Sequence, residues 1–232
     1  TFGAGGGSAP GMAWGPEECG RLPEDAAWLV VCRGGGRPAP DLRLENAHLA
    51  GLKRLKSLKI LDLQRAGSSC LPDGSGGGSR WDLLLTDEGL GHIAALGTLE
   101  ELYLPHAPDI TDRGLELLAA SLPRLRHLCL PFLGRVGRSG SLRLAALTAF
   151  PALASLDLRG AVGTEEATWP DCIASLAGLE VLDASWCRWL RGGRFAALAG
   201  MARLRKLTFH GAEDGVVLEG AALHDDRVPQ GG

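Results

Sequence analysis

The 232-residue chain has no long hydrophobic run, since its longest uninterrupted apolar stretch, Ala26 to Cys32, is only seven residues. A helix needs about 20 such residues to cross a bilayer, so the sequence predicts a soluble chain without a transmembrane segment. A strong positive charge is also missing, because the formal net charge is −3. Nucleic acids and anionic membranes are usually bound through a basic excess, so no direct nucleic-acid partner is expected.

Closely spaced cysteines are absent as well. The nearest two of the six cysteines are 13 positions apart, which excludes the C-x-x-C pairs of zinc ribbons and redox sites. The sole asparagine, Asn46, is followed by Ala and His, so there is no N-glycosylation sequon. These absences predict reduced thiols and an intracellular protein. The chain opens with Thr, and if a leader has been removed, a mitochondrial or other organellar location is expected.

Motifs for catalysis and cofactor binding are missing too. The glycines form neither G-x-G-x-x-G nor a phosphate-binding loop, and residues 137–140 lack the spacing of a G-x-S-x-G nucleophile elbow. We therefore predict no enzymatic activity, no cofactor and no metal. His127 and Cys129, two positions apart and near Tyr103 and Asp157, allow a metal or cysteine-nucleophile site as a minor alternative.

What the chain does contain is a repeated frame, L-x-x-L-x-L. It begins at Leu58, Leu99, Leu125, Leu153, Leu179 and Leu204. The steps between these leucines are 41, 26, 28, 26 and 25 residues, and the long first step contains a glycine-rich loop insertion at 67–80. Self-similarity at such a period predicts a solenoid.

Each repeat combines two periodicities. The frame alternates like a short strand, with its second and third leucines pointing inward, and the residues after it change to helical spacing. Thr86 and Thr111, each followed by Asp, are expected helix N-caps. The predicted fold class is therefore α/β, a solenoid with a parallel concave sheet and helices on the convex side. It is expected to hold about six to seven repeats over residues 41–215.

The two ends differ in kind from the repeats. Residues 1–40 are rich in Gly and Pro, and we expect them to form an extension whose segment 21–31 docks as a cap on the solenoid. At the other end, residues 216–218 are apolar and predict a closing strand, and the residues up to 232 predict a tail.

Three stretches relate the chain to a known family. Residues 85–90 and 110–115 share T-D-x-G-L, and the frame at 179–187 ends in Cys187. These motifs resemble leucine-rich repeat proteins of the cysteine-containing, ribonuclease-inhibitor-like class, which includes F-box proteins and related adaptors. The resemblance implies a horseshoe solenoid in which Cys187 bonds the turning backbone. It also implies a non-catalytic scaffold for protein partners.

Two functions remain open within that resemblance. The preferred one is an accessory subunit of a larger hetero-oligomeric complex, such as those of the short mitochondrial leucine-rich repeat proteins. The alternative is a substrate-recognition adaptor of a ubiquitin ligase, which requires an F-box. Only residues 22–25, Leu-Pro-Glu-Asp, faintly resemble the L-P-x-E start of one, with Asp in place of the Glu.

The outward-facing residues of the predicted strands form the candidate binding surface. Parallel strands lie about 4.8 Å apart, so six of them make a wall roughly 24 Å across. Its middle row holds three aspartates and no Lys or Arg, and aromatic residues follow the strands at one rim, which favours a partner with basic and apolar elements. The predicted protein-binding residues are Asp62, Glu101, Tyr103, His127, Cys129, Phe132, Asp157, Arg159, Asp183, Trp186, Lys206 and His210.

Overall fold

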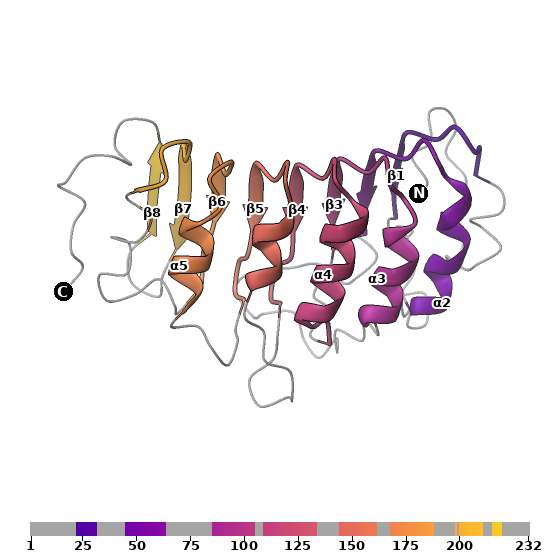
Figure 1. The fold of residues 1–232 in the computed structure, drawn as a ribbon, viewed down its shortest axis with the longest axis horizontal. Helices are drawn as coiled ribbons and strands as arrows, with labels where there is room; N and C mark the ends of the chain where they lie inside the picture. Colours follow the sequence, from indigo (N-terminus) through magenta and orange to yellow (C-terminus); the bar gives the residue numbers. More distant parts are fainter. Residues whose placement is uncertain are drawn as a thin grey trace, which may run out of the picture.

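The structure, a computed structural model, describes residues 22–31, 45–63, 85–104, 109–133, 144–161, 168–187, 198, 200–210 and 215–219. These residues form one eight-stranded sheet in which every strand pairs with the next along the chain. Strands β1 to β7 are parallel, and β8 is antiparallel to β7. Figure 1 shows the strands in a row with the helices along one side. The predicted α/β solenoid is confirmed.

The elements are short, as the repeat length requires. The strands are β1 (Trp28–Val30), β2 (Ile60–Asp62), β3 (Glu101–Tyr103), β4 (His127–Cys129), β5 (Ser155–Asp157), β6 (Val181–Asp183), β7 (Lys206–His210) and β8 (Gly215–Glu219). The α-helices are α2 (Asn46–Leu49), α3 (Asp87–Ala94), α4 (Asp112–Ser121) and α5 (Trp169–Ala174). Two 3₁₀ helices, η1 (Ala50–Arg54) and η3 (Ala145–Ala149), take part in the same layer of the fold.

A column of leucines runs through the sheet because the strands pair without any slip in register. Its members are Leu29, Leu61, Leu102, Leu128, Leu156, Leu182 and Leu207. Each is at most 3% exposed. A single strand and helix cannot cover these side chains, so each repeat depends on its neighbours for burial.

The sheet begins earlier than the sequence predicts. Strand β1 lies inside the segment 1–40 that was expected to be an extension, and it pairs with β2 as a full parallel strand. Leu29 and Val31 are both 2% exposed and take the places of the second and third leucines of the frame. The parallel sheet therefore begins before the expected boundary at residue 41, in a repeat that is hard to recognise because Ala26 and Val31 replace the first and third leucines of the frame.

Strand β8 lies where the sequence predicted a closing strand. The predicted loop insertion at 67–80, the glycine-rich start at 1–21 and the tail from 220 to 232 lie outside the described residues. Within the described part of the chain, no helix is long and apolar enough to cross a membrane.

The T-D-x-G-L motif is explained by hydrogen bonds between repeats. Thr86 and Thr111 are N-caps, as predicted, and the Thr111 hydroxyl accepts from the Arg113 amide at 3.2 Å. The Asp87 carboxylate accepts from the amide of Thr111 at 2.9 Å and from its hydroxyl at 2.6 Å. Asp112 bonds the amide of Leu144 in the same way at 3.1 Å. The first helical residue of one repeat therefore fixes the start of the next.

The glycine of the motif makes room for this bond. A Cβ atom on Gly114 would overlap the Asp87 carboxylate, and a Cβ on Gly89 would come within 2.6 Å of Asn46 Oδ1. Asn46 plays the part of Asp87 one repeat earlier, because its Oδ1 accepts from the Thr86 amide at 3.1 Å. Aspartate and glycine in successive repeats thus form one packing unit.

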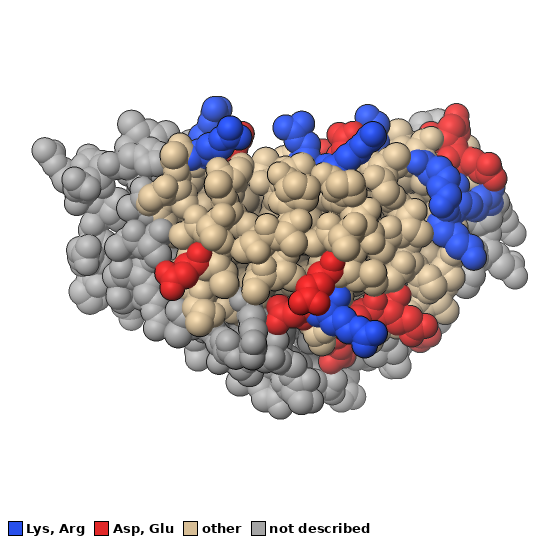
Figure 2. All heavy atoms as spheres, viewed as in Figure 1, with Lys and Arg blue, Asp and Glu red and all other residues tan. Residues whose placement is uncertain are grey.

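Charged side chains are unevenly distributed over the molecule. Figure 2 views the helix side and shows few charges over the middle of that face, with Lys and Arg along the upper edge. Exposed arginines occur in the turns just before β4 and β7, namely Arg124, Arg126, Arg203 and Arg205. The middle of the helix side therefore carries few charges in this view, although α3 and α4 include exposed charged residues such as Glu88, Arg113 and Glu116.

We expect Gly114→Ala to lower the free energy of unfolding by roughly 1–3 kcal/mol, because the new methyl group displaces the Asp87 carboxylate from Thr111. The matched control is Gly91→Ala in α3, where the nearest atom, Leu117 Cδ2, is 3.8 Å from the new Cβ. That change should be neutral or stabilising by up to about 1 kcal/mol, because Ala is the better helix former. Urea unfolding followed by circular dichroism measures both, and equal effects would contradict the packing unit.

Candidate protein-binding surface

The side of the sheet away from the helices, called here the open sheet face, carries two columns of side chains. The register defines the first as Trp28, Ile60, Glu101, His127, Ser155, Val181 and Lys206. It defines the second as Val30, Asp62, Tyr103, Cys129, Asp157, Asp183 and Thr208. From β2 to β7 these are the rows that the sequence predicted, so the predicted residues in them lie on one continuous surface.

The first repeat adds two residues that sequence reasoning missed. Trp28 is 39% exposed and Val30 is half-buried, and they stand next to Ile60 and Asp62. The signal for them was the apolar run at residues 26–31, which fits the frame once Ala26 and Val31 are allowed in place of its first and third leucines. The N-terminal end of the open sheet face is therefore more apolar than expected.

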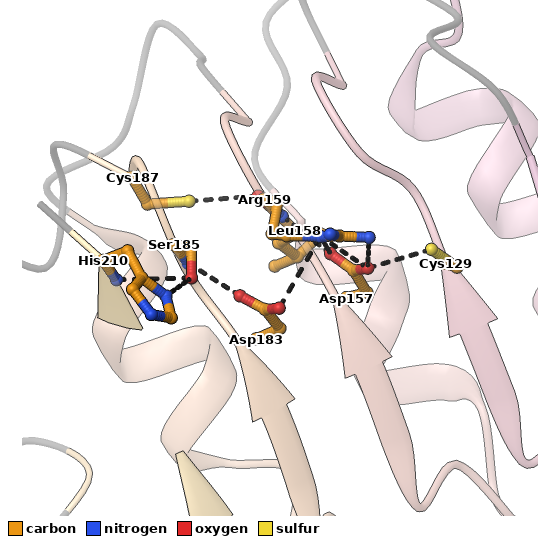
Figure 3. A network of polar contacts seen from close by, with 8 residues as sticks. All are labelled: Cys129, Asp157, Leu158, Arg159, Asp183, Ser185, Cys187 and His210. Carbon is orange, nitrogen blue, oxygen red and sulfur yellow. Dashed lines mark hydrogen bonds and ion pairs between the residues drawn. The ribbon is translucent and has the colours of Figure 1, made fainter. Parts of the chain in front are cut away.

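An ion-pair network connects the ends of β5 and β6. Arg159 Nε donates to both Asp157 oxygens, at 3.1 and 2.9 Å, and its Nη2 lies 2.7 Å from Asp157 Oδ2. Arg159 Nε also lies 3.6 Å from Asp183 Oδ2. Figure 3 shows Arg159 between the two carboxylates. Arg159 therefore neutralises part of the negative charge that Asp157 and Asp183 give to the middle row.

Cys129 is buried, which corrects the prediction that it is an exposed contact residue. Its side chain lies in the second column, but the residue is only 5% exposed, and its thiol donates to Asp157 Oδ2 at 3.1 Å. Burial raises the pKa of the Cys129 thiol well above its usual range, and the charge of Asp157 and its hydrogen bond raise it further. Since the thiolate is the nucleophile, the structure argues against the cysteine-nucleophile alternative.

Tyr103 and Glu101 form a second polar pair on the same face. The Tyr103 hydroxyl donates to Glu101 Oε2 at 2.7 Å. Burial raises the pKa of Tyr103, and the hydrogen bond and charge of Glu101 add to the rise. The hydroxyl therefore stays protonated and binds the Glu101 carboxylate two residues away along β3.

Ser185 and His210 resemble part of a catalytic triad but are arranged differently. Ser185 Oγ lies 3.0 Å from His210 Nδ1 and accepts from the His210 amide at 3.3 Å. Asp183 Oδ1 accepts from the Ser185 amide at 2.9 Å. In a triad the carboxylate would orient the imidazole through its other nitrogen, whereas here it binds the backbone. The three residues tie β6 to β7 (Figure 3).

Just beyond the strands, three successive repeats place one residue in the left-handed region. These residues are Phe132, Gly160 and Trp186, with φ angles of 56°, 64° and 63°. The amide of each donates to a carbonyl of the next repeat, at 2.6, 2.8 and 2.7 Å. We call this row the strand-exit row. Both of its aromatic members are predicted contact residues, and they are 39% and 46% exposed.

Three cysteines lie among the described residues. Cys129, Cys172 and Cys187 are free thiols. Cys187 has the role that the family resemblance implied, because its thiol donates to the carbonyl of Leu158 at 3.0 Å. Among the described residues, no three His, Cys, Asp or Glu side chains are grouped so that they could hold a metal ion.

The in-register parallel strands, the leucine column and the helical return of each repeat define a leucine-rich repeat solenoid. No family model and no curated protein matches the chain. Among solved structures, it is similar to the leucine-rich repeat protein LIC12759 of Leptospira interrogans, with 21% identity, a TM-score of 0.45 and coverage of 68% of this chain and 32% of that one.

Two further solved structures are similar in part. One is the yeast complex of Rad7 and Elc1, with 16% identity, a TM-score of 0.47 and coverage of 75% of this chain and 42% of that chain. The other is the internalin InlF of Listeria monocytogenes, with 18% identity, a TM-score of 0.38 and coverage of 84% and 56%. The chain therefore spans between a third and just over half of the length of these proteins.

We expect Ser185→Ala to lower the free energy of unfolding by about 1–3 kcal/mol, because Ser185 is 2% exposed and its loss leaves the His210 amide without this acceptor. Ser155→Ala, on the more exposed part of the open sheet face, should change it by less than about 0.5 kcal/mol. Thermal unfolding of the two variants measures the difference. A Ser185→Ala protein as stable as the Ser155→Ala protein would contradict the structural role of Ser185.

Cys129 should resist alkylation in the folded protein. Its buried, protonated thiol should react with iodoacetamide at least tenfold more slowly than the half-buried Cys172 between pH 7 and 9, with the rates read by peptide mass spectrometry. In guanidinium chloride the two should react alike, which serves as the control. Rapid native modification of Cys129 would show that it is accessible as a thiolate.

Proposed function

We propose that the protein is a non-catalytic scaffold that binds other proteins through the open sheet face and its strand-exit row. The observation that carries this proposal is the continuous surface of polar and apolar side chains held by a rigid, in-register sheet. Surfaces of this kind, with aromatic and charged groups at fixed spacing, suit the recognition of a protein partner.

The role we favour is that of an accessory subunit in a larger hetero-oligomeric assembly, including an organellar one. The two potential reactive groupings support a binding role over catalysis, since Cys129 is held as a thiol and Ser185 is used to join strands. The charges of the face suit a partner with both basic and apolar groups, because four acidic side chains in its columns oppose two basic ones when Arg159 is counted.

The alternative is a substrate-recognition adaptor of a ubiquitin ligase. That role needs an F-box-like helical element, and residues 22–25, Leu-Pro-Glu-Asp, match its L-P-x-E start only in part. In the structure, residues 22–31 form a turn and the strand β1 instead. Because this segment is not helical, it supports the accessory-subunit role better than the adaptor role.

Affinity capture with paired variants tests the proposal. Ser155→Arg with Val181→Arg places two bulky charges in the middle of the open sheet face, and we expect this pair to abolish capture of the partners that wild type retains. Because both side chains lie outside the leucine column, the melting temperature should change little. Mass spectrometry of the captured proteins also separates the roles, since Skp1 and a cullin would indicate the adaptor.

The matched control makes the same chemical change on the opposite side. Ala120→Arg with Ala149→Arg adds two arginines at exposed positions of α4 and η3. This pair should capture the same proteins as wild type. If the helix-side pair lost its partners and the sheet-side pair kept them, the binding surface would be the helix face and the proposal would be wrong.

A further inference from the structure

Two exposed aromatic residues occupy a backbone conformation that costs them free energy. An L-residue in the left-handed region brings its Cβ close to the following carbonyl, and bulky side chains rarely adopt it. Phe132 and Trp186 do so at φ 56° and 63°. Gly160 shows that the same place in the repeat accepts glycine, which has no such strain. The turn therefore requires the conformation, and glycine can supply it without an aromatic side chain.

The other strained residue lies wholly in the core, whereas these two lie only partly against the protein. Leu144, at φ 58°, is completely buried, and its amide is bonded to Asp112. Phe132 and Trp186 leave 39% and 46% of their surface in solvent. Strained residues of this kind tend to be found where a ligand is held.

The polar groups beside the aromatic pair favour a cation. Asp157 and Asp183 carry two negative charges against the single positive charge of Arg159. Arg159 binds Asp157 closely, whereas its distance to Asp183 Oδ2 is 3.6 Å. The Asp183 side chain is 25% exposed, and Trp186 follows it by three residues. An arriving Lys or Arg could therefore bind Asp183 and stack on the indole ring.

The spacing of the row indicates an extended protein segment. Phe132 and Trp186 are two strands apart, which is about 10 Å at 4.8 Å per strand. A segment in the extended polyproline II conformation rises about 3.1 Å per residue with three residues per turn, so side chains three positions apart lie on the same face and are about 9 Å apart. A segment along the strand-exit row could thus place an apolar side chain at Phe132 and a basic one at Trp186.

We propose that the strand-exit row anchors an extended partner segment with an apolar residue three positions from a Lys or Arg. The apolar residue packs on Phe132, and the cation lies between Trp186 and Asp183. This inference rests on the proposed scaffold function and names the chemistry of its partner.

A random 12-residue peptide library displayed on phage tests this directly, with the full chain as the target. We expect the selected peptides to be enriched in apolar-x-x-Lys or apolar-x-x-Arg. Their Kd, measured by fluorescence anisotropy with synthetic copies, should rise at least tenfold for Phe132→Asn with Trp186→Asn. Asn tolerates the left-handed region, so the double variant should keep a melting temperature close to that of wild type. Asp183→Asn should weaken binding about three- to tenfold, because it removes charge and keeps the acceptor for the Ser185 amide.

Leu117→Asn is the matched control, because Leu117 is 41% exposed but lies on the helix side in α4. It should leave peptide affinity unchanged. Failure to select any peptide, selection of peptides without basic residues, or equal binding to the double Asn variant would overturn the inference. If the Ser155→Arg, Val181→Arg protein lost its captured partners while the double Asn variant kept them, the scaffold function would stand and this anchor would not.

Discussion

The structure depends on the burial of leucines between neighbouring repeats. Leu61, Leu102, Leu128 and their equivalents are excluded from water only because each strand pairs with the next without a shift. A slip of one residue would turn every inward side chain outward. Asp87 and Asp112 fix the same register at the helix starts through Thr111 and Leu144. Every surface feature of the sheet follows from this constraint.

The register that buries the leucines also brings like charges together. Asp157 and Asp183 are direct neighbours on adjacent strands, where two carboxylates repel each other. Arg159 relieves this repulsion by lying between the two carboxylates. The Cys129 thiol also donates to Asp157 Oδ2, and the Ser185 amide donates to Asp183 Oδ1. The acidic row is therefore an ordered network that keeps only part of its attraction for a basic partner.

The repeat frame allowed the fold and the rows of the sheet to be predicted, because leucines at fixed spacing determine both the inward column and the residues between its members. Strand β1 was missed because Ala26 and Val31 stand at the first and third positions of the frame, which leaves Leu29 as the only leucine of that repeat's frame. The position of Arg159 could not be read, since alternation gives the direction of a side chain only within a strand. Cys129 was expected to be exposed because alternation gives only the direction of its side chain. Its contact with Asp157 on the neighbouring strand could not be predicted from that pattern. The Asp and Gly of T-D-x-G-L were recognised as a motif in the sequence. Their contact could not be predicted, because the Asp of one repeat packs against the Gly of the next.

The conformation of the strand-exit row had a signal in the sequence that becomes clear only when the repeats are aligned. Phe132, Gly160 and Trp186 occupy the same place in consecutive repeats. A glycine there indicates a left-handed backbone, and the equal turn geometry of the repeats extends that indication to its neighbours. Gly160 also gives the ring of Phe132 its space, because a Cβ would overlap that ring. One glycine thus serves both its own turn and the aromatic residue of the preceding repeat. Burial of the leucines stabilises the fold enough to hold the two aromatic residues in a strained, partly exposed conformation. The core therefore provides stability, and the strand-exit row provides the proposed binding surface.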